Sequence, residues 1–160
     1  MNVTQREAGF MRKAIELSRN GITTGEGGPF GCVVVKGDKI IGSGWNQVTS
    51  AKDPTAHAEI VAIRDACTRL QSFQLTGCEI YTSCEPCPMC MGAIYWARPD
   101  KVYYANTHQD AAAAGFDDSF IYEELTAPVN NRKIPMIRVE QPEALQVFKE
   151  WKEKGDKMVY

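Results

Sequence analysis

The sequence predicts an α/β protein in which a mixed β-sheet carries helices on both faces. Segments with helical spacing alternate with short apolar, β-branched segments along most of the chain. The first two apolar segments are separated only by the turn sequence Lys36-Gly37-Asp38, which favours a hairpin. An antiparallel hairpin followed by strands that alternate with helices implies a mixed sheet with helices on both sides.

The first elements are a helix and the hairpin. Thr4-Gln5-Arg6-Glu7 has the pattern of a capping box, apolar residues then recur at helical spacing, and Asn20-Gly21 is expected to end this helix. The apolar segment 30–35 predicts a central strand, and 39–45 predicts its antiparallel neighbour.

A second helix is predicted over 55–70, because Asp53-Pro54 combines a favoured N-cap residue with proline at the first helical position. A third strand at 79–82 then precedes a helix at 86–96. The rest of the chain predicts a fourth strand, two short helices, a fifth strand and a closing helix, over residues 101–105, 110–114, 119–125, 133–139 and 142–154.

The bulk properties favour a single cytoplasmic domain, residues 1–160. A length of 160 residues suits one domain with its own core. The net charge of −2 lacks the basic character of a nucleic-acid-binding protein, so we expect no nucleic-acid partner. No apolar run approaches the ~20 residues that cross a membrane, and residues 1–13 lack the apolar core of a secretory signal.

The chemistry of the chain is concentrated in two motifs. His57-Ala58-Glu59 and Pro86-Cys87-Pro88-Met89-Cys90 together offer one imidazole and two thiolates. Three such ligands suit Zn²⁺ and leave a fourth coordination position for water, whose pKa zinc lowers towards neutrality. Glu59 is the candidate to carry the proton of that water. Residues two apart on a helix diverge, so only the motif itself indicates that Glu59 faces the metal.

Other interpretations of these cysteines remain open. Cys87 and Cys90 alone could form a redox pair, although such pairs need no His57-x-Glu59. Cys84, Cys87 and Cys90 have part of a ferredoxin spacing, but no further cysteine follows. Cys84 could instead complete a closed structural zinc site, which would make the protein a zinc-stabilised binding module without catalysis.

The two motifs form the known signature of zinc deaminases, and the chain resembles the cytidine deaminase superfamily. Longer stretches are similar to the bacterial guanine deaminases, namely Gly28-Pro29-Phe30-Gly31, residues 53–59, residues 92–97, residues 114–120 and the terminal Tyr160. This resemblance implies a three-layer α/β/α fold around a five-stranded sheet. It also implies one Zn²⁺ per subunit and a homodimer in which about residues 142–160 cross to the partner subunit.

The resemblance further implies hydrolysis of guanine at C2 to give xanthine and ammonia. Zinc would be held by His57, Cys87 and Cys90, and Glu59 would be the catalytic residue. The purine would be contacted by Asn46, Phe30, Ala58, Trp96, Asp118 and Tyr160. Plain structural roles are open for several of these, since Asn46 could form a turn and Asp118 could cap a helix. Another deaminase of the superfamily, acting on cytosine, guanosine or tRNA adenosine, is the alternative function.

Overall fold

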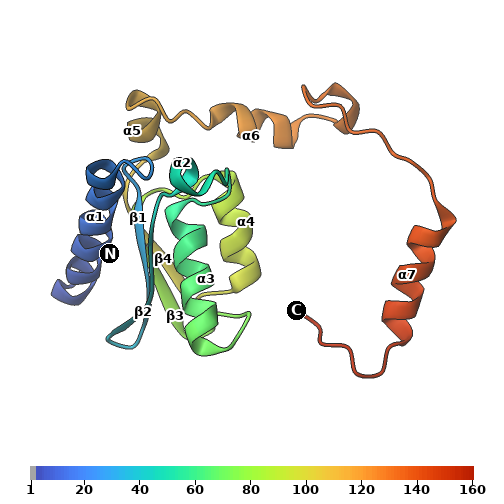
Figure 1. The fold of residues 1–160 in the computed structure, drawn as a ribbon, viewed down its shortest axis with the longest axis horizontal. Helices are drawn as coiled ribbons and strands as arrows, with labels where there is room; N and C mark the ends of the chain where they lie inside the picture. Colours follow the sequence, from blue (N-terminus) through green and yellow to red (C-terminus); the bar gives the residue numbers. More distant parts are fainter. Residues whose placement is uncertain (1–2) are drawn as a thin grey trace. The chain divides into compact units, whose positions relative to one another are not determined.

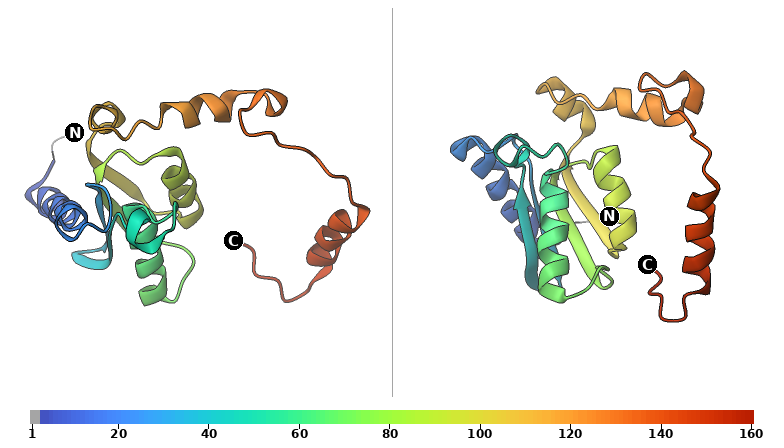
Figure 2. Two further views of the ribbon diagram at one scale, coloured as in Figure 1. Left: turned by 45° about the horizontal axis from the view of Figure 1, so that its top comes forward. Right: turned by 45° about the vertical axis from the view of Figure 1, so that its right-hand side comes forward.

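The computed structural model describes residues 3–160, which divide into two compact units. The first ends at Ser119, and the second comprises Phe120–Tyr160. Each unit is described separately (Figures 1 and 2). Within residues 3–160, the structure has no helix that is both long and apolar enough to span a membrane.

A four-stranded sheet forms the centre of the first unit. Its strands are β1 (Gly31–Lys36), β2 (Lys39–Trp45), β3 (Cys78–Cys84) and β4 (Lys101–Asn106), in the spatial order β2-β1-β3-β4. β1 pairs antiparallel with β2 and β3, whereas β3 and β4 are parallel. The predicted mixed sheet is therefore confirmed for its first four strands.

Helices cover both faces of this sheet, as Figure 1 shows. Helix α1 (Gln5–Thr24) packs on one face, where Val33, Val35 and Tyr81 join Ala14 in one apolar cluster. Helices α3 (Ala58–Leu70) and α4 (Pro88–Ala97) supply residues to the cluster on the other face. Cys32, Val34 and Ile80 point to that side, because successive side chains of a strand alternate between faces.

Glycines let α3 approach β2 closely. A Cβ on Gly44 would lie 2.7 Å from the Ala58 carbonyl oxygen, and one on Gly42 would lie 2.5 Å from that of Ala62. Real Cβ atoms do not come so near, so only glycine allows this separation. The contact with Gly44 fixes the first turn of α3 above the end of β2.

Two helix boundaries differ from the prediction. The capping box at Thr4 is present, but α1 continues to Thr24 and ends at the left-handed Gly25 instead of at Asn20-Gly21. The predicted N-cap at Asp53 is wrong, because the Asp53 carboxylate accepts bonds from the backbone and hydroxyl of Thr55 in a tight turn. The helix begins at Ala58, and its N-cap is His57.

The predicted fifth strand at 133–139 is also wrong. The sheet of the described chain has four strands, and residues 133–139 form neither helix nor strand. Pro135 interrupts this segment and has no N–H for a ladder. A strand is defined by pairing, and within residues 3–160 the structure pairs this segment with no other strand.

The shorter elements complete the chain. The first unit also contains α2 (Val48–Ala51), which the sequence did not predict, and α5 (His108–Ala113). Helix α6 (Ser119–Thr126) leads into the second unit, which continues with a 3₁₀ turn, Val129–Asn131, and with α7 (Pro142–Glu153). The predicted helices near 110–114, 119–125 and 142–154 are therefore confirmed with small changes of boundary.

Candidate metal centre

The two sequence motifs meet because each one starts a helix. His57 is the N-cap of α3 and Cys87 is the N-cap of α4, and both have extended backbone angles. Pro88 begins α4, a position that needs no N–H. Neither cap side chain bonds to its own helix, so both remain available to a ligand. Two helix N-termini, each with a partial positive charge, therefore favour anionic groups at this point.

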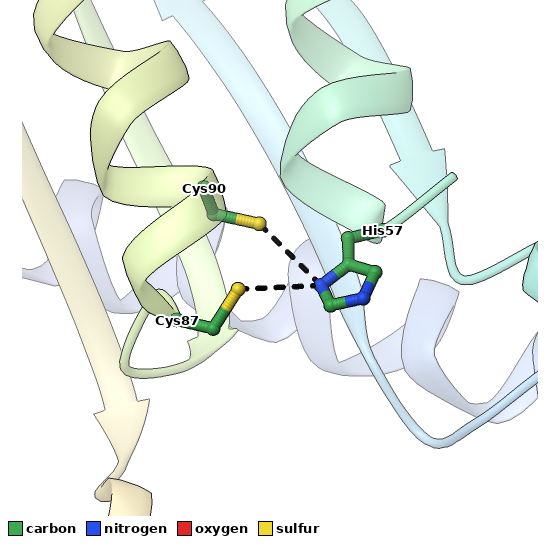
Figure 3. Close-up of side chains that lie close together, drawn as sticks. All are labelled: His57, Cys87 and Cys90. Atoms are coloured by element: carbon green, nitrogen blue, oxygen red, sulfur yellow. Dashed lines mark hydrogen bonds between the residues drawn. The ribbon is translucent and has the colours of Figure 1, made fainter. Parts of the chain in front are cut away.

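Figure 3 shows the His57 ring and the sulfur atoms of Cys87 and Cys90 pointing towards one another. Each Sγ lies 3.5 Å from His57 Nδ1, and the three ligand atoms all lie within 4.8 Å of one another. Bond lengths of about 2.3 Å to sulfur and 2.0–2.1 Å to nitrogen place tetrahedral zinc ligands about 3.6 Å apart. The observed spacing therefore fits one zinc ion bound through Nδ1.

Glu59 lies beside this cluster and is almost completely buried, with 5% of its surface exposed. Its Oε1 accepts a 2.7 Å bond from the Thr82 hydroxyl, and its Oε2 accepts a 3.4 Å bond from the Cys90 thiol. Burial raises the pKa of this carboxyl above its ordinary value. Because His57 is a cap outside the helical turn, its side chain and that of Glu59 do not diverge as two helical residues would.

The hydrogen bonds among His57, Cys87 and Cys90 shift their pKa values in ways that suit metal binding. The hydrogen bond from Cys90 lowers the pKa of Cys87 well below its ordinary value, which favours the thiolate form of Cys87. The same bond raises the pKa of Cys90, and the contact with Cys87 raises that of His57. A divalent cation would displace the remaining protons and leave two thiolates and a neutral imidazole as ligands.

Cys84 is not part of the cluster. Its thiol donates to the Thr107 carbonyl oxygen at 3.5 Å, and burial raises its pKa to about 11. A buried thiol with this partner does not provide a fourth thiolate. Among the described residues, the structure therefore supports a site with three protein ligands over a closed four-ligand site.

Two residues predicted to bind the purine lie next to the glycine-rich loop that follows α1, residues 25–29. Asn46 is buried at the end of β2, and its side-chain oxygen accepts bonds from the backbone N–H groups of Gly28 and Val48, both at 3.2 Å. The turn role considered for Asn46 is therefore present. Phe30 is half-buried and packs edge-on against Phe116, with ring centroids 5.0 Å apart.

The other four residues predicted to contact the purine differ in how far they are buried. Ala58 is fully buried directly after His57, the candidate metal ligand. Asp118 is close enough for its charge to interact with that of Cys87, and burial is the main cause of its raised pKa. Trp96, on α4, is 63% exposed. Tyr160 belongs to the second unit and is 66% exposed.

Two contributions were not predicted from the sequence. Thr82 holds the catalytic candidate Glu59, and Phe116 forms the aromatic pair with Phe30. Strand alternation is the signal that could have found Thr82, since it lies two residues after Ile80 and shares its face. Phe116 had no such signal, because loop geometry decides its position.

Removing single ligands tests the metal assignment. Zinc-loaded wild-type protein is expected to contain one zinc per chain, and Cys87→Ala or His57→Ala should lower this stoichiometry strongly, because three ligands leave no spare donor. Cys84→Ala is the matched control and should retain one zinc. Metal analysis after gel filtration gives the measurement. Loss of zinc from Cys84→Ala would contradict the three-ligand site.

Comparisons with known proteins address the same region. The family described as the cytidine and deoxycytidylate deaminase zinc-binding region matches residues 4–106, which include every residue of the metal cluster and Glu59. The chain is 54% identical to guanine deaminase of Bacillus subtilis over 151 residues, covering 94% of this chain and 97% of that protein. It is 42% identical to a tRNA-specific adenosine deaminase of Aquifex aeolicus over 96 residues, 60% of this chain and 63% of that protein.

Solved structures agree with these relationships. The crystal structure of Bacillus subtilis guanine deaminase matches with a TM-score of 0.94 and 52% identity, covering 100% of this chain and 99% of that one. A guanine deaminase from Nitrosomonas europaea matches with a TM-score of 0.66 and 33% identity, covering 74% of this chain and 67% of that one. The resemblance to bacterial guanine deaminases is thereby confirmed, and the chain belongs to the zinc-dependent cytidine and deoxycytidylate deaminase family.

Proposed function

We propose that this protein is a guanine deaminase, which hydrolyses guanine at C2 to xanthine and ammonia. The observation that carries the proposal is the buried Glu59 carboxylate, held by Thr82 and next to Cys90 at an open three-ligand metal site. A zinc site that only stabilises a fold needs no buried carboxylate beside it. The relative that matches nearly the whole chain is named guanine deaminase, and this supports the choice of substrate.

His57, Cys87 and Cys90 would hold the zinc ion. When bound, zinc lowers the pKa of a coordinated water from 15.7 to about 7 in favourable sites. The protein's own contribution is to fix the three ligands on two helix starts and to surround them with buried side chains, since Cys90 is fully buried. Such an environment strengthens electrostatic interactions with the substrate.

Glu59 would transfer the protons. Its carboxylate takes a proton from the attacking water, whose oxygen forms a bond to C2, and passes the proton to a ring nitrogen. It would then take the second proton of that water from the oxygen now bonded to C2 and donate it to the departing amine, so that the C2–N bond breaks, the C2 carbonyl forms and ammonia leaves. The Thr82 hydroxyl occupies Oε1, which leaves Oε2, the oxygen beside Cys90, for this work. Burial raises the pKa of this carboxyl towards neutral pH, which suits a group that both accepts and donates protons.

The purine would be recognised by residues with complementary hydrogen-bonding groups. Because the Asn46 oxygen already accepts two backbone bonds, its NH₂ is the group left to donate to a purine acceptor. Asp118, when ionised, only accepts, and so complements purine N–H groups. The complete proposed set is Asn46, Phe30, Ala58, Trp96, Asp118 and Tyr160.

A tRNA substrate is the alternative within the family. The tRNA-specific relative matches only 60% of this chain, whereas the guanine deaminase matches 94%. The net charge of −2 also gives little attraction for RNA phosphates. We therefore favour a free purine base, and we include a cytoplasmic location in the proposal because all six cysteines are unpaired.

Replacing the proton carrier tests the reaction. Zinc-loaded Glu59→Gln should keep one zinc per chain and lose about 10²–10⁴-fold in kcat, because the amide cannot accept the proton. Conversion of guanine to xanthine is followed by ultraviolet absorbance. Glu16→Gln, which alters only an exposed carboxylate in α1, is the control and should match the wild type. Equal activity of Glu59→Gln and wild type would refute the assigned role.

Neighbouring aspartates provide a test of the substrate. Asp117 accepts a 2.9 Å bond from the Ser119 backbone N–H and acts as a turn residue, whereas Asp118 is assigned to the purine. Asp118→Ala should raise KM for guanine by about ten- to a hundredfold, the range for loss of a hydrogen bond to a charged group, with zinc retained. Asp117→Ala should change KM by much less. The assignment fails if both variants have the same KM.

We also propose that the chain acts as a single deaminase domain in a homodimer, with about residues 142–160 exchanged between subunits. The support is the apolar surface of the second unit. Helix α7 exposes four large apolar side chains, Leu145, Val147, Phe148 and Trp151. Residues 133–139 likewise expose Ile134, Met136, Ile137 and Val139. Such a concentration is typical of a surface that a partner covers.

Mixing two inactive variants tests the exchange. Glu59→Gln lacks the proton carrier, and Tyr160→Ala lacks the residue proposed to come from the partner subunit. After unfolding and refolding together, an exchanged heterodimer contains one intact site, so about a quarter of wild-type activity should return. Sedimentation equilibrium should give twice the chain mass of 17.8 kDa. Exchange is disproved if the mixture forms dimers that stay inactive.

A further inference from the structure

Two adjacent glycines, Gly27 and Gly28, pack closely against side chains near the proposed purine-binding residues. A Cβ on Gly27 would lie 2.3 Å from both the backbone oxygen and Oδ1 of Asn46. A Cβ on Gly28 would lie 3.1 Å from ring carbons of Phe116 and Phe30. Neither glycine has the positive φ that favours this residue type, in contrast to Gly25. Close packing, and not backbone conformation, therefore favours glycine at both positions. A Cβ on Gly27 would overlap Asn46, and one on Gly28 would force the neighbouring rings to move by a few tenths of an ångström.

The first contact determines what Asn46 offers to a ligand. The Gly28 N–H and the Val48 N–H both donate to Asn46 Oδ1, and an amide oxygen accepts about two hydrogen bonds. With its oxygen occupied, the carboxamide can only donate. A side chain on Gly27 would displace this carboxamide and remove the fixed orientation.

The Gly28 contact involves Phe116, which lies in the same segment as Asp118. The Phe116 ring stands edge-on to Phe30, at an interplanar angle of 86°, and both rings contact Gly28. The Phe116 backbone N–H also bonds to the Ala111 carbonyl oxygen at 2.9 Å, which fixes the chain two residues before Asp118. The space left by Gly28 therefore sets the position of the Phe116 side chain. Phe116 lies two residues before Asp118 in the chain.

The loop itself is anchored and cannot easily move away. The Glu26 carboxylate accepts a hydrogen bond from the Trp45 indole N–H. The Glu26 carbonyl oxygen accepts bonds from the Thr49 hydroxyl at 2.7 Å and from the Ser50 N–H at 3.2 Å. An added methyl group on Gly27 must therefore shift Asn46, and one on Gly28 must shift Phe30 or Phe116.

We propose that Gly27 and Gly28 are specificity-determining positions for the purine. They hold Asn46 as a hydrogen-bond donor and set the position of Phe116 ahead of Asp118. The ligand class this arrangement selects is a base with an acceptor on one edge and an N–H donor on another. This inference rests on the proposed function, and it adds two positioning residues that touch no zinc ligand in the structure.

A double-mutant cycle tests the link between Gly28 and Phe116. Gly28→Ala, Phe116→Leu and the double variant are made in the zinc-loaded Glu59→Gln protein, so that guanine binds without turnover, and affinities are measured by calorimetry. Gly28→Ala should weaken guanine binding by about tenfold, the scale of a local overpacking cost, with one zinc per chain retained. In the Phe116→Leu background, where the contact with the Phe116 ring is absent and only that with Phe30 remains, the added methyl should weaken binding by less than it does in the parent.

Gly9→Ala is the matched control, because its Cβ would have its nearest neighbour at 3.9 Å, and it should bind guanine as the parent does. The inference is overturned if Gly28→Ala weakens guanine binding equally in both backgrounds, or in neither. The proposed function still stands in that case if the parent protein binds guanine. Wild-type protein that neither binds nor deaminates guanine overturns the proposed function and this inference with it.

Discussion

The whole site depends on the meeting of two helix N-termini on one face of the sheet. His57 and Cys87 are extended N-cap residues whose side chains make no capping bond, so both can turn to a shared metal. Cys90 joins them from the first turn of α4. This meeting requires α3 to lie very close to β2, and the glycines at 42 and 44 make that approach sterically allowed. The N-termini of α3 and α4 also give a positive potential, which favours thiolates and an anionic reaction partner.

The second requirement is a carboxylate that stays buried. Burying a charged carboxylate alone is costly, and the Thr82 hydroxyl stabilises Glu59 by a hydrogen bond to Oε1. The sheet provides this support, because strand alternation turns Thr82 towards α3 and α4 while Tyr81 faces α1. A protein that used zinc only for stability would gain nothing from this arrangement. The fold therefore explains why the metal cluster and the proposed proton carrier, Glu59, occur together.

Much of this could be predicted from the sequence, and the failures have local causes. The ligand triad and the first four strands follow from spacing and apolar pattern, which depend on near neighbours in the chain. The start of α3 was misplaced, because Asp53-Pro54 forms a turn as readily as a cap. The fifth strand failed because Pro135 lies in it and because pairing depends on residues outside the segment. The contacts of Gly28 with Phe30 and Phe116 join residues that no local pattern relates.

Three protein ligands that hold one zinc ion would leave one coordination position open. Zinc X-ray absorption spectroscopy of the loaded protein measures the ligand set directly. We expect two sulfur ligands at about 2.3 Å and two nitrogen or oxygen ligands at about 2.0–2.1 Å, with one of the nitrogen or oxygen ligands exchangeable. Three sulfur ligands would bring Cys84 into the site and would contradict an open site with three protein ligands.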